Sequence, residues 1–177
     1  QQTGKKVVML QCGWFGTEQV EDAFKQGVTR FCPSVRAMFV DGREAAPRRH
    51  AWAAADIFVS LSDNIQETFG LTPIEAMAAG LPVVVTDWDG YKETVADGLD
   101  GYRVRTFMPA KGYGNLFART YESGVHSYDL YTGLTCMLVS VDHEQCARRL
   151  ADLIADPQLR RRLGDAGREH ARAEFDW

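Results

Sequence analysis

Short apolar runs alternate with helix-forming segments along most of the chain. The apolar runs predict strands at residues 6–11, 37–40, 57–61, 82–86 and 101–104. The patterns between them predict helices at residues 17–28, 47–55 and 72–79. Strands of continuous apolar character are typical of a parallel sheet that helices cover on both faces. The fold class is therefore predicted as α/β, a doubly wound parallel sheet with right-handed crossovers, which binds ligands at the carboxyl edge of its strands.

The alternation breaks between residues 107 and 136. This stretch is too aromatic for a disordered linker and too irregular for another strand–helix unit. Its aromatic residues are Phe107, Tyr113, Phe117, Tyr121, Tyr128 and Tyr131. We expect an inserted helical arm or flap here.

Two further helices are predicted after this segment. Residues 143–155 place four apolar side chains on one helical stripe, namely Cys146, Leu150, Leu153 and Ile154. Asp156 then supplies an N-cap and Pro157 a first helical position for a last helix that runs toward residue 173.

Composition limits the class of protein. The 177 residues are 45% hydrophobic and 25% charged, as expected for one soluble globular domain spanning residues 1–177. The net charge of -4, with both signs interspersed, does not favour a nucleic-acid or anionic-membrane surface. The cysteines are scattered and the histidines are not clustered, which indicates reduced, mostly buried thiols and no metal site. No apolar run approaches the roughly 20 residues of a membrane span, and a cytoplasmic location is expected.

Both ends of the chain resemble cut ends. Gln1–Gln2–Thr3–Gly4 leads at once into a strand pattern, and the sequence stops at Phe175–Asp176–Trp177, whose large aromatic side chains an intact protein would cover. The expectation is a piece of a longer protein.

The most informative stretch is residues 66–82, QETFGLTPIEAMAAGLP. Thr72 is predicted as an N-cap, with Pro73 at the first helical position and Glu75 completing a capping box. Gly80 is suited to end the helix, and Pro82 blocks its continuation. The prediction is a short helix that is fixed at both ends.

The start of this helix is a candidate anion site. Unpaired N–H groups and the positive end of the helix dipole favour a bound phosphate there. Gly70 lets the backbone approach a ligand closely, so residues 69–72 can hold a diphosphate without a metal. Neither G-x-x-x-x-G-K-[ST] nor G-x-G-x-x-G occurs in the chain.

Two carboxylates, Glu67 and Glu75, flank the candidate anion site. Acidic groups beside a phosphate are unfavourable unless they bind hydroxyls, and sugars offer vicinal hydroxyl pairs that suit a carboxylate. The pattern thus favours a sugar on one side and a ribose on the other. Paired carboxylates also serve glycoside hydrolases, but there they flank one bond with no anion site between them. By local sequence alone, Glu75 serves as a helix cap as readily as a ligand.

The same stretch resembles the E-x7-E signature of retaining GT-B glycosyltransferases of family 4, or group 1, and of their glycogen-synthase-like relatives. The likeness extends upstream to residues 54–59 and downstream to residues 89–95 and 97–102, and most of residues 5–104 and 139–177 follow the family pattern. The resemblance implies the C-terminal, Rossmann-like half of a GT-B fold, interrupted by the aromatic segment. Hexosyl transfer from an NDP-sugar, with retention at the anomeric carbon and usually without a bound metal or other cofactor, is also implied.

The resemblance also implies roles for individual residues. The residue matching Glu67, the catalytic candidate, contacts hydroxyls of the donor sugar, and the residue matching Glu75 binds the nucleotide ribose. Donor-binding positions are implied for the backbone amides of the loop and for the glycine after the first strand, namely Phe69, Gly70, Leu71, Thr72 and Gly13. Residues 42–43 resemble, more weakly, the place where the base rests.

The chain departs from the family in two ways. The Arg and Lys that neutralise the diphosphate in the family have no match here, because Lys5–Lys6 lack the context. The acceptor-binding N-terminal domain is also missing, so these parts are expected upstream in the intact protein and the fragment alone is expected to be inactive. The rival interpretations are a sugar-nucleotide epimerase or phosphorylase and a non-catalytic nucleotide-binding or signalling domain.

For several residues the sequence is compatible with more than one role. The aromatic segment is an acceptor-recognition flap, an oligomer contact or, the favoured option, a cap over the sheet edge. Trp14 and Phe15 line a cleft or, more simply, pack, and Trp88 fits either role equally. The sequence does not distinguish UDP, GDP and ADP, and it assigns no role to His126, His143 or His170.

Overall fold

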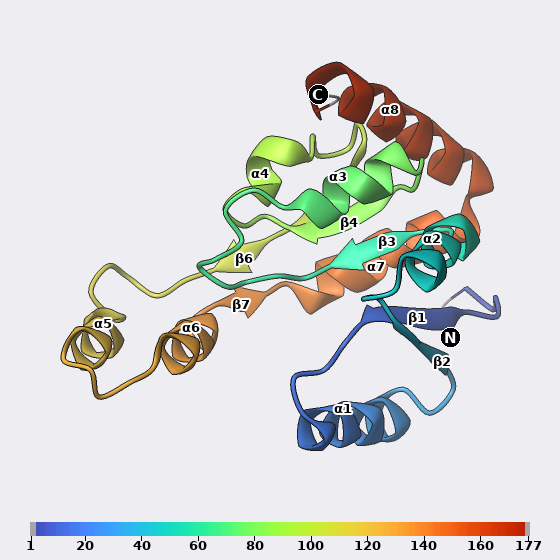
Figure 1. The fold of residues 1–177 in the computed structure, drawn as a ribbon. Helices are drawn as coiled ribbons and strands as arrows, with labels where there is room; N and C mark the ends of the chain where they lie inside the picture. The colour runs from blue at the N-terminus through green and yellow to red at the C-terminus, as the bar shows by residue number, and fades with distance from the viewer. Residues whose placement is uncertain (1–2, 176–177) are drawn as a thin grey trace. The chain divides into compact units, whose positions relative to one another are not determined.

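A computed structural model describes residues 3–175, so Gln1, Gln2, Asp176 and Trp177, on which the expectation of cut ends partly rests, lie outside the described residues. The chain forms two compact units, Gln1–Ala55 and Asp56–Trp177 (Figure 1). They are described separately below. The extent of the domain predicted from the sequence, residues 1–177 with an insertion at 107–136, stays a prediction.

The first unit is a strand–helix–strand–helix segment. Strands β1 (Val8–Gly13) and β2 (Arg36–Asp41) pair in parallel. Helices α1 (Glu18–Phe31) and α2 (Ala45–Ala54) follow them. Thr17 caps α1 as predicted, because its hydroxyl accepts the Val20 N–H at 3.3 Å. The rings of Phe15, Phe24 and Phe39 pack on one another, so packing is the observed role of Phe15, whereas Trp14 is exposed.

The second unit is built on a three-stranded parallel sheet in the order β3 (Phe58–Ser60), β4 (Val83–Thr86), β5 (Gly101–Val104). Helix α3 (Leu71–Ala78) connects β3 to β4, and the short helix α4 (Tyr91–Thr94), which the sequence analysis missed, lies between β4 and β5. Every residue of β4 is buried, because α3 and α7 (His143–Ala155) cover opposite faces of the sheet (Figure 1). The predicted α/β class with parallel pairing is confirmed.

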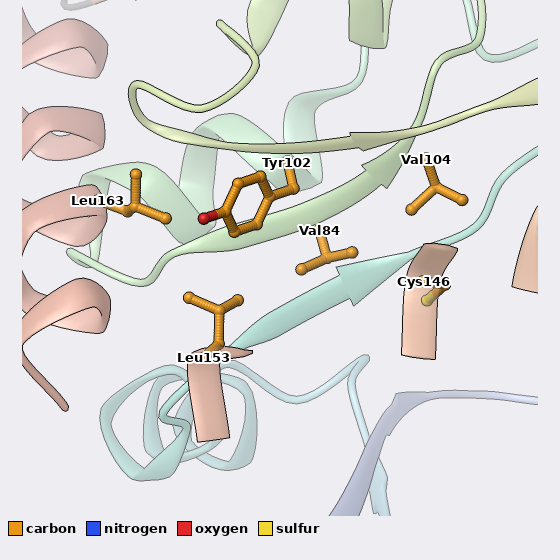
Figure 2. Close-up of a cluster of buried hydrophobic side chains, with 6 residues drawn as sticks. All are labelled: Val84, Tyr102, Val104, Cys146, Leu153 and Leu163. Atoms are coloured by element: carbon orange, nitrogen blue, oxygen red, sulfur yellow. The ribbon is translucent and has the colours of Figure 1, made fainter. Parts of the chain in front are cut away.

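One face of this sheet carries a compact hydrophobic core. It joins β4 and β5 to α7 and to α8 (Pro157–Phe175) through the side chains in Figure 2, which are Val84, Tyr102, Val104, Cys146, Leu153 and Leu163. The stripe predicted on α7 therefore faces the core. Asp156 caps α8 as predicted, since its carboxylate accepts the N–H groups of Gln158 and Leu159.

Helix α8 packs closely along α3, and two glycines of α8 allow it. A Cβ at Gly164 would lie 2.2 Å from the carbonyl oxygen of Gly80, and one at Gly167 would lie 3.2 Å from Cγ of Met77. Gly80 itself ends α3 with φ 81°, and the N–H groups of Gly80 and Leu81 bond to the last turn. This is the glycine stop that the sequence predicts.

The aromatic segment is helical, as predicted, and it begins and ends in a two-stranded ribbon. Strands β6 (Thr106–Phe107) and β7 (Ser140–Val141) pair antiparallel, and α5 (Asn115–Glu122) and α6 (Tyr128–Cys136) lie between them. The rings of Tyr121 and Tyr131 stack at 5.1 Å between centroids. Burial, together with the nearby Asp63 carboxylate, raises the pKa of the Cys136 thiol.

The thiols differ from the expectation in part. All four cysteines are free, but only Cys146 is buried and Cys32 is exposed. Within residues 3–175, no helix is both long and apolar enough to cross a membrane.

Candidate functional site

The loop between β3 and α3 is held by hydrogen bonds from the next strand. The Asn64 side chain accepts the Gln66 N–H at 2.9 Å and fixes a tight turn. From the end of β4, the Thr86 hydroxyl donates to the Ser62 carbonyl, and the Trp88 indole donates to the Asn64 carbonyl at 2.8 Å. Trp88 is 8% exposed, so packing is its role. Since β3 and β4 are parallel neighbours, both connections lie at the carboxyl edge of the sheet.

Helix α3 begins at Leu71, two residues before Pro73, which was predicted as the first helical position. Gly70 is the N-cap in a left-handed conformation, with φ 85°, and no side chain caps the helix. The predicted capping box of Thr72 and Glu75 is therefore wrong. A glycine adopts positive φ without steric cost, so the helix can begin at this position without a side-chain cap.

The first turn of α3 offers backbone donors. The helical pattern leaves the N–H groups of Gly70, Leu71 and Thr72 without intrahelical acceptors. Pro73 has no N–H, and its place in the first turn costs no helical hydrogen bond. Leu71 is 57% exposed and Thr72 is also exposed, so this side of the turn is open to solvent, whereas Gly70 is buried. The arrangement suits a bound anion.

Residues Gly90 and Tyr91 support the loop from below the helix start. A Cβ at Gly90 would lie 2.4 Å from the backbone of Thr68 and Phe69, and a Cβ at Gly70 would lie 2.4 Å from the Tyr91 ring. Tyr91 is fully buried. The loop and this turn therefore fit together without space for an added methyl group.

The Tyr91 phenol joins Glu67 to β3. Its oxygen lies 2.8 Å from Oγ of Ser60 and 3.3 Å from Oε2 of Glu67. Burial is the main reason that the pKa of Tyr91 lies above its usual value, and the Glu67 carboxylate adds to the shift. The phenol thus stays protonated and can donate to the carboxylate at neutral pH.

The structure gathers some of the predicted site residues and leaves others apart. Glu67 is half-buried, and Gly70 and Thr72 contact the same tyrosine. The Phe69 ring packs edge-on against Phe175 of α8 at 5.9 Å. Glu75 is exposed one turn further along α3.

Two predicted positions lie in the first unit. Gly13 ends β1, and its carbonyl accepts the Gly42 N–H at 3.1 Å. Next to it, the Arg43 guanidinium bonds Asp41 at 2.6 Å and lowers the pKa of that carboxyl to about 2.

The sequence analysis missed Ser60, Gly90 and Tyr91 as supports of the loop. The available signal was the Asp89–Gly90 turn directly after a buried strand, at the same sheet edge as the glycine loop. It also gave no partner to His170, whose Nδ1 lies 2.5 Å from Oδ2 of the buried Asp100. That pair ties α8 to the turn before β5. No group of three or more His, Cys, Asp or Glu side chains between residues 3 and 175 is placed to hold a metal ion.

Comparison with protein families adds the deciding observation. Residues 39–111, which include the whole loop and its supports, match the family described as glycosyl transferases group 1. The chain contains a group 1 glycosyltransferase domain. The family resemblance predicted from the E-x7-E-like stretch is confirmed at this level.

Curated relatives of this group 1 domain are longer proteins. Spore coat protein SA of Bacillus subtilis is 25% identical over 97% of the chain, and alpha-maltose-1-phosphate synthase of Mycobacterium tuberculosis is 28% identical over 96%. D-inositol 3-phosphate glycosyltransferase of Streptomyces avermitilis is 33% identical over 70% of the chain and is covered over 19% of its own length. The chain spans 37% of the length of each of the first two.

Solved structures show the same fold. Sucrose-phosphate synthase of Thermosynechococcus elongatus superposes with a TM-score of 0.66 at 23% identity over 97% of the chain and 35% of its own. HepE of Anabaena in complex with UDP-glucose gives a TM-score of 0.62 at 22% identity, covering 99% of this chain and 38% of that one. The domain has the Rossmann-like architecture of the C-terminal half of GT-B enzymes.

Proposed function

We propose that the chain is the donor-binding domain of a retaining glycosyltransferase that moves a sugar, of hexosyl type, from an NDP-sugar to an acceptor. The observation that carries the proposal is the loop of residues 66–72. It places free backbone amides at the start of α3 beside the half-buried carboxylate of Glu67, at the carboxyl edge of a parallel sheet. Phosphate binds the amides, and hydroxyls bind the carboxylate.

The amides and the helix dipole serve the leaving group. Donors that are already aimed at a developing charge stabilise it without reorganisation, so cleavage of the sugar–diphosphate bond needs no metal in this proposal. Basic groups that complete the charge balance belong to other parts of the intact protein. Glu67 accepts hydroxyls of the donor sugar, and Glu75 on the next turn accepts those of the ribose. A donor-binding role for the backbone of Gly13 is part of the proposal on the ground of the family resemblance alone.

The known relatives support this substrate class. HepE, which shares the fold, is described with UDP-glucose, and several curated relatives are named as glycosyltransferases or synthases. Because the chain spans about a third of those proteins, we propose that an acceptor-binding domain works with it in cis and that the 177-residue chain alone does not transfer sugar. We propose a cytoplasmic location for the chain, which fits a nucleotide-sugar donor.

The alternative is an epimerase or a non-catalytic nucleotide-binding domain of the same fold. Both share the anion-binding amides, so the fold does not separate them from a transferase. Sugar recognition by Glu67 distinguishes a transferase from a domain that only binds the nucleotide. The product that the intact protein forms from the donor distinguishes a transferase from an epimerase.

A titration of the chain with nucleotides tests the proposal. We expect one of UDP, GDP and ADP, or the matching UDP-glucose, GDP-mannose and ADP-glucose, to shift the backbone amide NMR signals of residues 67–75. The affinity is expected to be weak, since the diphosphate lacks its basic partners, and NMR detects weak binding. Signals that stay unchanged with all six compounds would refute the donor-binding proposal.

Alanine substitutions of Glu75 and Glu67 are expected to impair different steps, nucleotide binding and turnover respectively. Glu75→Ala should weaken binding of the nucleotide by about 10- to 100-fold, because a carboxylate–hydroxyl contact contributes about 1.5–3 kcal/mol. Glu67→Ala in the intact enzyme should mainly lower kcat, by about 100-fold if the contact tightens in the transition state. Nucleotide titrations and steady-state kinetics measure the two effects. Equal losses of nucleotide affinity in both variants would contradict this division of roles.

A further inference from the structure

The turn after β4 holds Glu67 at two points. The Gly90 N–H donates to the Glu67 carbonyl at 3.2 Å, and the Tyr91 hydroxyl donates to Oε2 of the Glu67 carboxylate at 3.3 Å. Adjacent residues of one turn therefore fix both the backbone and the side chain of the acidic residue. The other oxygen, Oε1, keeps its full capacity to accept hydrogen bonds.

The direction of the hydrogen bonds around Tyr91 is determined by proton count. A carboxylate only accepts, so the single phenol proton goes to Glu67. The Ser60 hydroxyl, 2.8 Å away, then donates to the phenol oxygen. Hydrogen bonds in such a chain strengthen one another, and here they connect β3 to the carboxylate.

The ring of Tyr91 has a second, separable task. It is fully buried and lies against Gly70, where it fills the space that a Cβ would need. The ring thus serves packing, whereas the hydroxyl, at its end, serves Glu67. Removal of the oxygen alone tests the second task without disturbing the first.

We propose that Tyr91 is a positioning residue, whose hydroxyl orients the Glu67 carboxylate for the donor sugar and so determines how strongly the site distinguishes an NDP-sugar from the bare nucleotide. This inference rests on the proposed function. Without the hydroxyl, the half-buried Glu67 side chain regains rotamer freedom, and the sugar contact loses its preorganisation. The diphosphate contacts are backbone amides and stay unchanged.

The test compares Tyr91→Phe with the wild-type chain by NMR titration, using the pairs UDP and UDP-glucose, GDP and GDP-mannose, and ADP and ADP-glucose. The quantity of interest is the ratio of the two dissociation constants within the pair that binds best. We expect the nucleotide affinity of Tyr91→Phe to stay within about twofold of wild type and the ratio to fall about three- to tenfold. If the role of the hydroxyl were purely structural, the affinities for the nucleotide and for the NDP-sugar would fall by the same factor.

Two controls make the result specific. Tyr102→Phe removes a hydroxyl from a buried tyrosine of the core in Figure 2, outside the loop, and should leave the ratio unchanged. In a Glu67→Ala background, Tyr91→Phe should change the ratio no further, because its effect passes through that carboxylate. An unchanged ratio in Tyr91→Phe, an equal loss for both compounds, or a wild-type ratio of one in all three pairs overturns the inference. Absence of any nucleotide response in the wild type instead overturns the proposed function.

Discussion

Replacement of Gly70 by alanine is expected to destabilise the second unit by about 3 kcal/mol and to abolish nucleotide binding. Two costs add. A residue with a Cβ loses about 1–2 kcal/mol in the left-handed region, where Gly70 has φ 85°. The new methyl carbon would also lie 2.4 Å from the ring of Tyr91, which is fully buried and has no space to move. Urea unfolding and the nucleotide titration measure the two effects.

Gly98 provides a matched control for the backbone part of this cost. It has φ 78°, but a Cβ there meets no atom within 4 Å. Gly98→Ala should therefore lose only the conformational share, about 1–2 kcal/mol, and should keep nucleotide binding. If both variants lose the same free energy of unfolding, the contact between Gly70 and Tyr91 adds no steric cost to the substitution.

The second large effect is expected at the contact between α8 and the end of α3. Gly164→Ala should lower the free energy of unfolding by about 2 kcal/mol, although alanine favours a helix by about 1 kcal/mol over glycine. The added Cβ would lie 2.2 Å from the Gly80 carbonyl oxygen, and backbone on both sides must separate to admit it. Far-UV circular dichroism during urea unfolding gives the midpoint and slope.

Gly133 in α6 is the corresponding helical control. A Cβ there meets nothing within 4 Å, so Gly133→Ala should be neutral or stabilise the protein by up to about 1 kcal/mol. Opposite signs for the two glycines would establish that packing, not helix propensity, determines the effect at Gly164. A stabilising Gly164→Ala would show that α8 can move away from α3 at little cost.

Local patterns predicted the regular elements well because local chemistry determines them. The strand predicted at residues 101–104 and the helix predicted at 143–155 have the observed bounds. The caps at Thr17 and Asp156 form as expected, because each needs only its own side chain and a backbone N–H two or three residues later. The glycine stop at Gly80 depends on the same short range.

The start of α3 could not be predicted in the same way. Its sequence is compatible with a cap at Thr72 or at Gly70, and the choice depends on Tyr91, which lies 19 positions after Thr72 in the sequence and packs against both residues. The same tyrosine gives Glu67 its partner. A single sequence does not show which distant residue fills the space beneath a loop. The position of the loop between β3 and α3 was therefore predictable, whereas its support by Tyr91 was not.

The pairing of β6 with β7 has a consequence for how such a chain can vary. Thr106 lies opposite Val141, and Phe107 lies opposite Ser140, so the stretch with both short helices leaves the sheet-bearing body and returns to it at one place. A tight hairpin of a few residues could join β6 and β7 in place of the stretch that holds α5 and α6, without a change in β5 or α7. Insertion, replacement or deletion of the segment between β6 and β7 would therefore leave the loop of residues 66–72 unchanged.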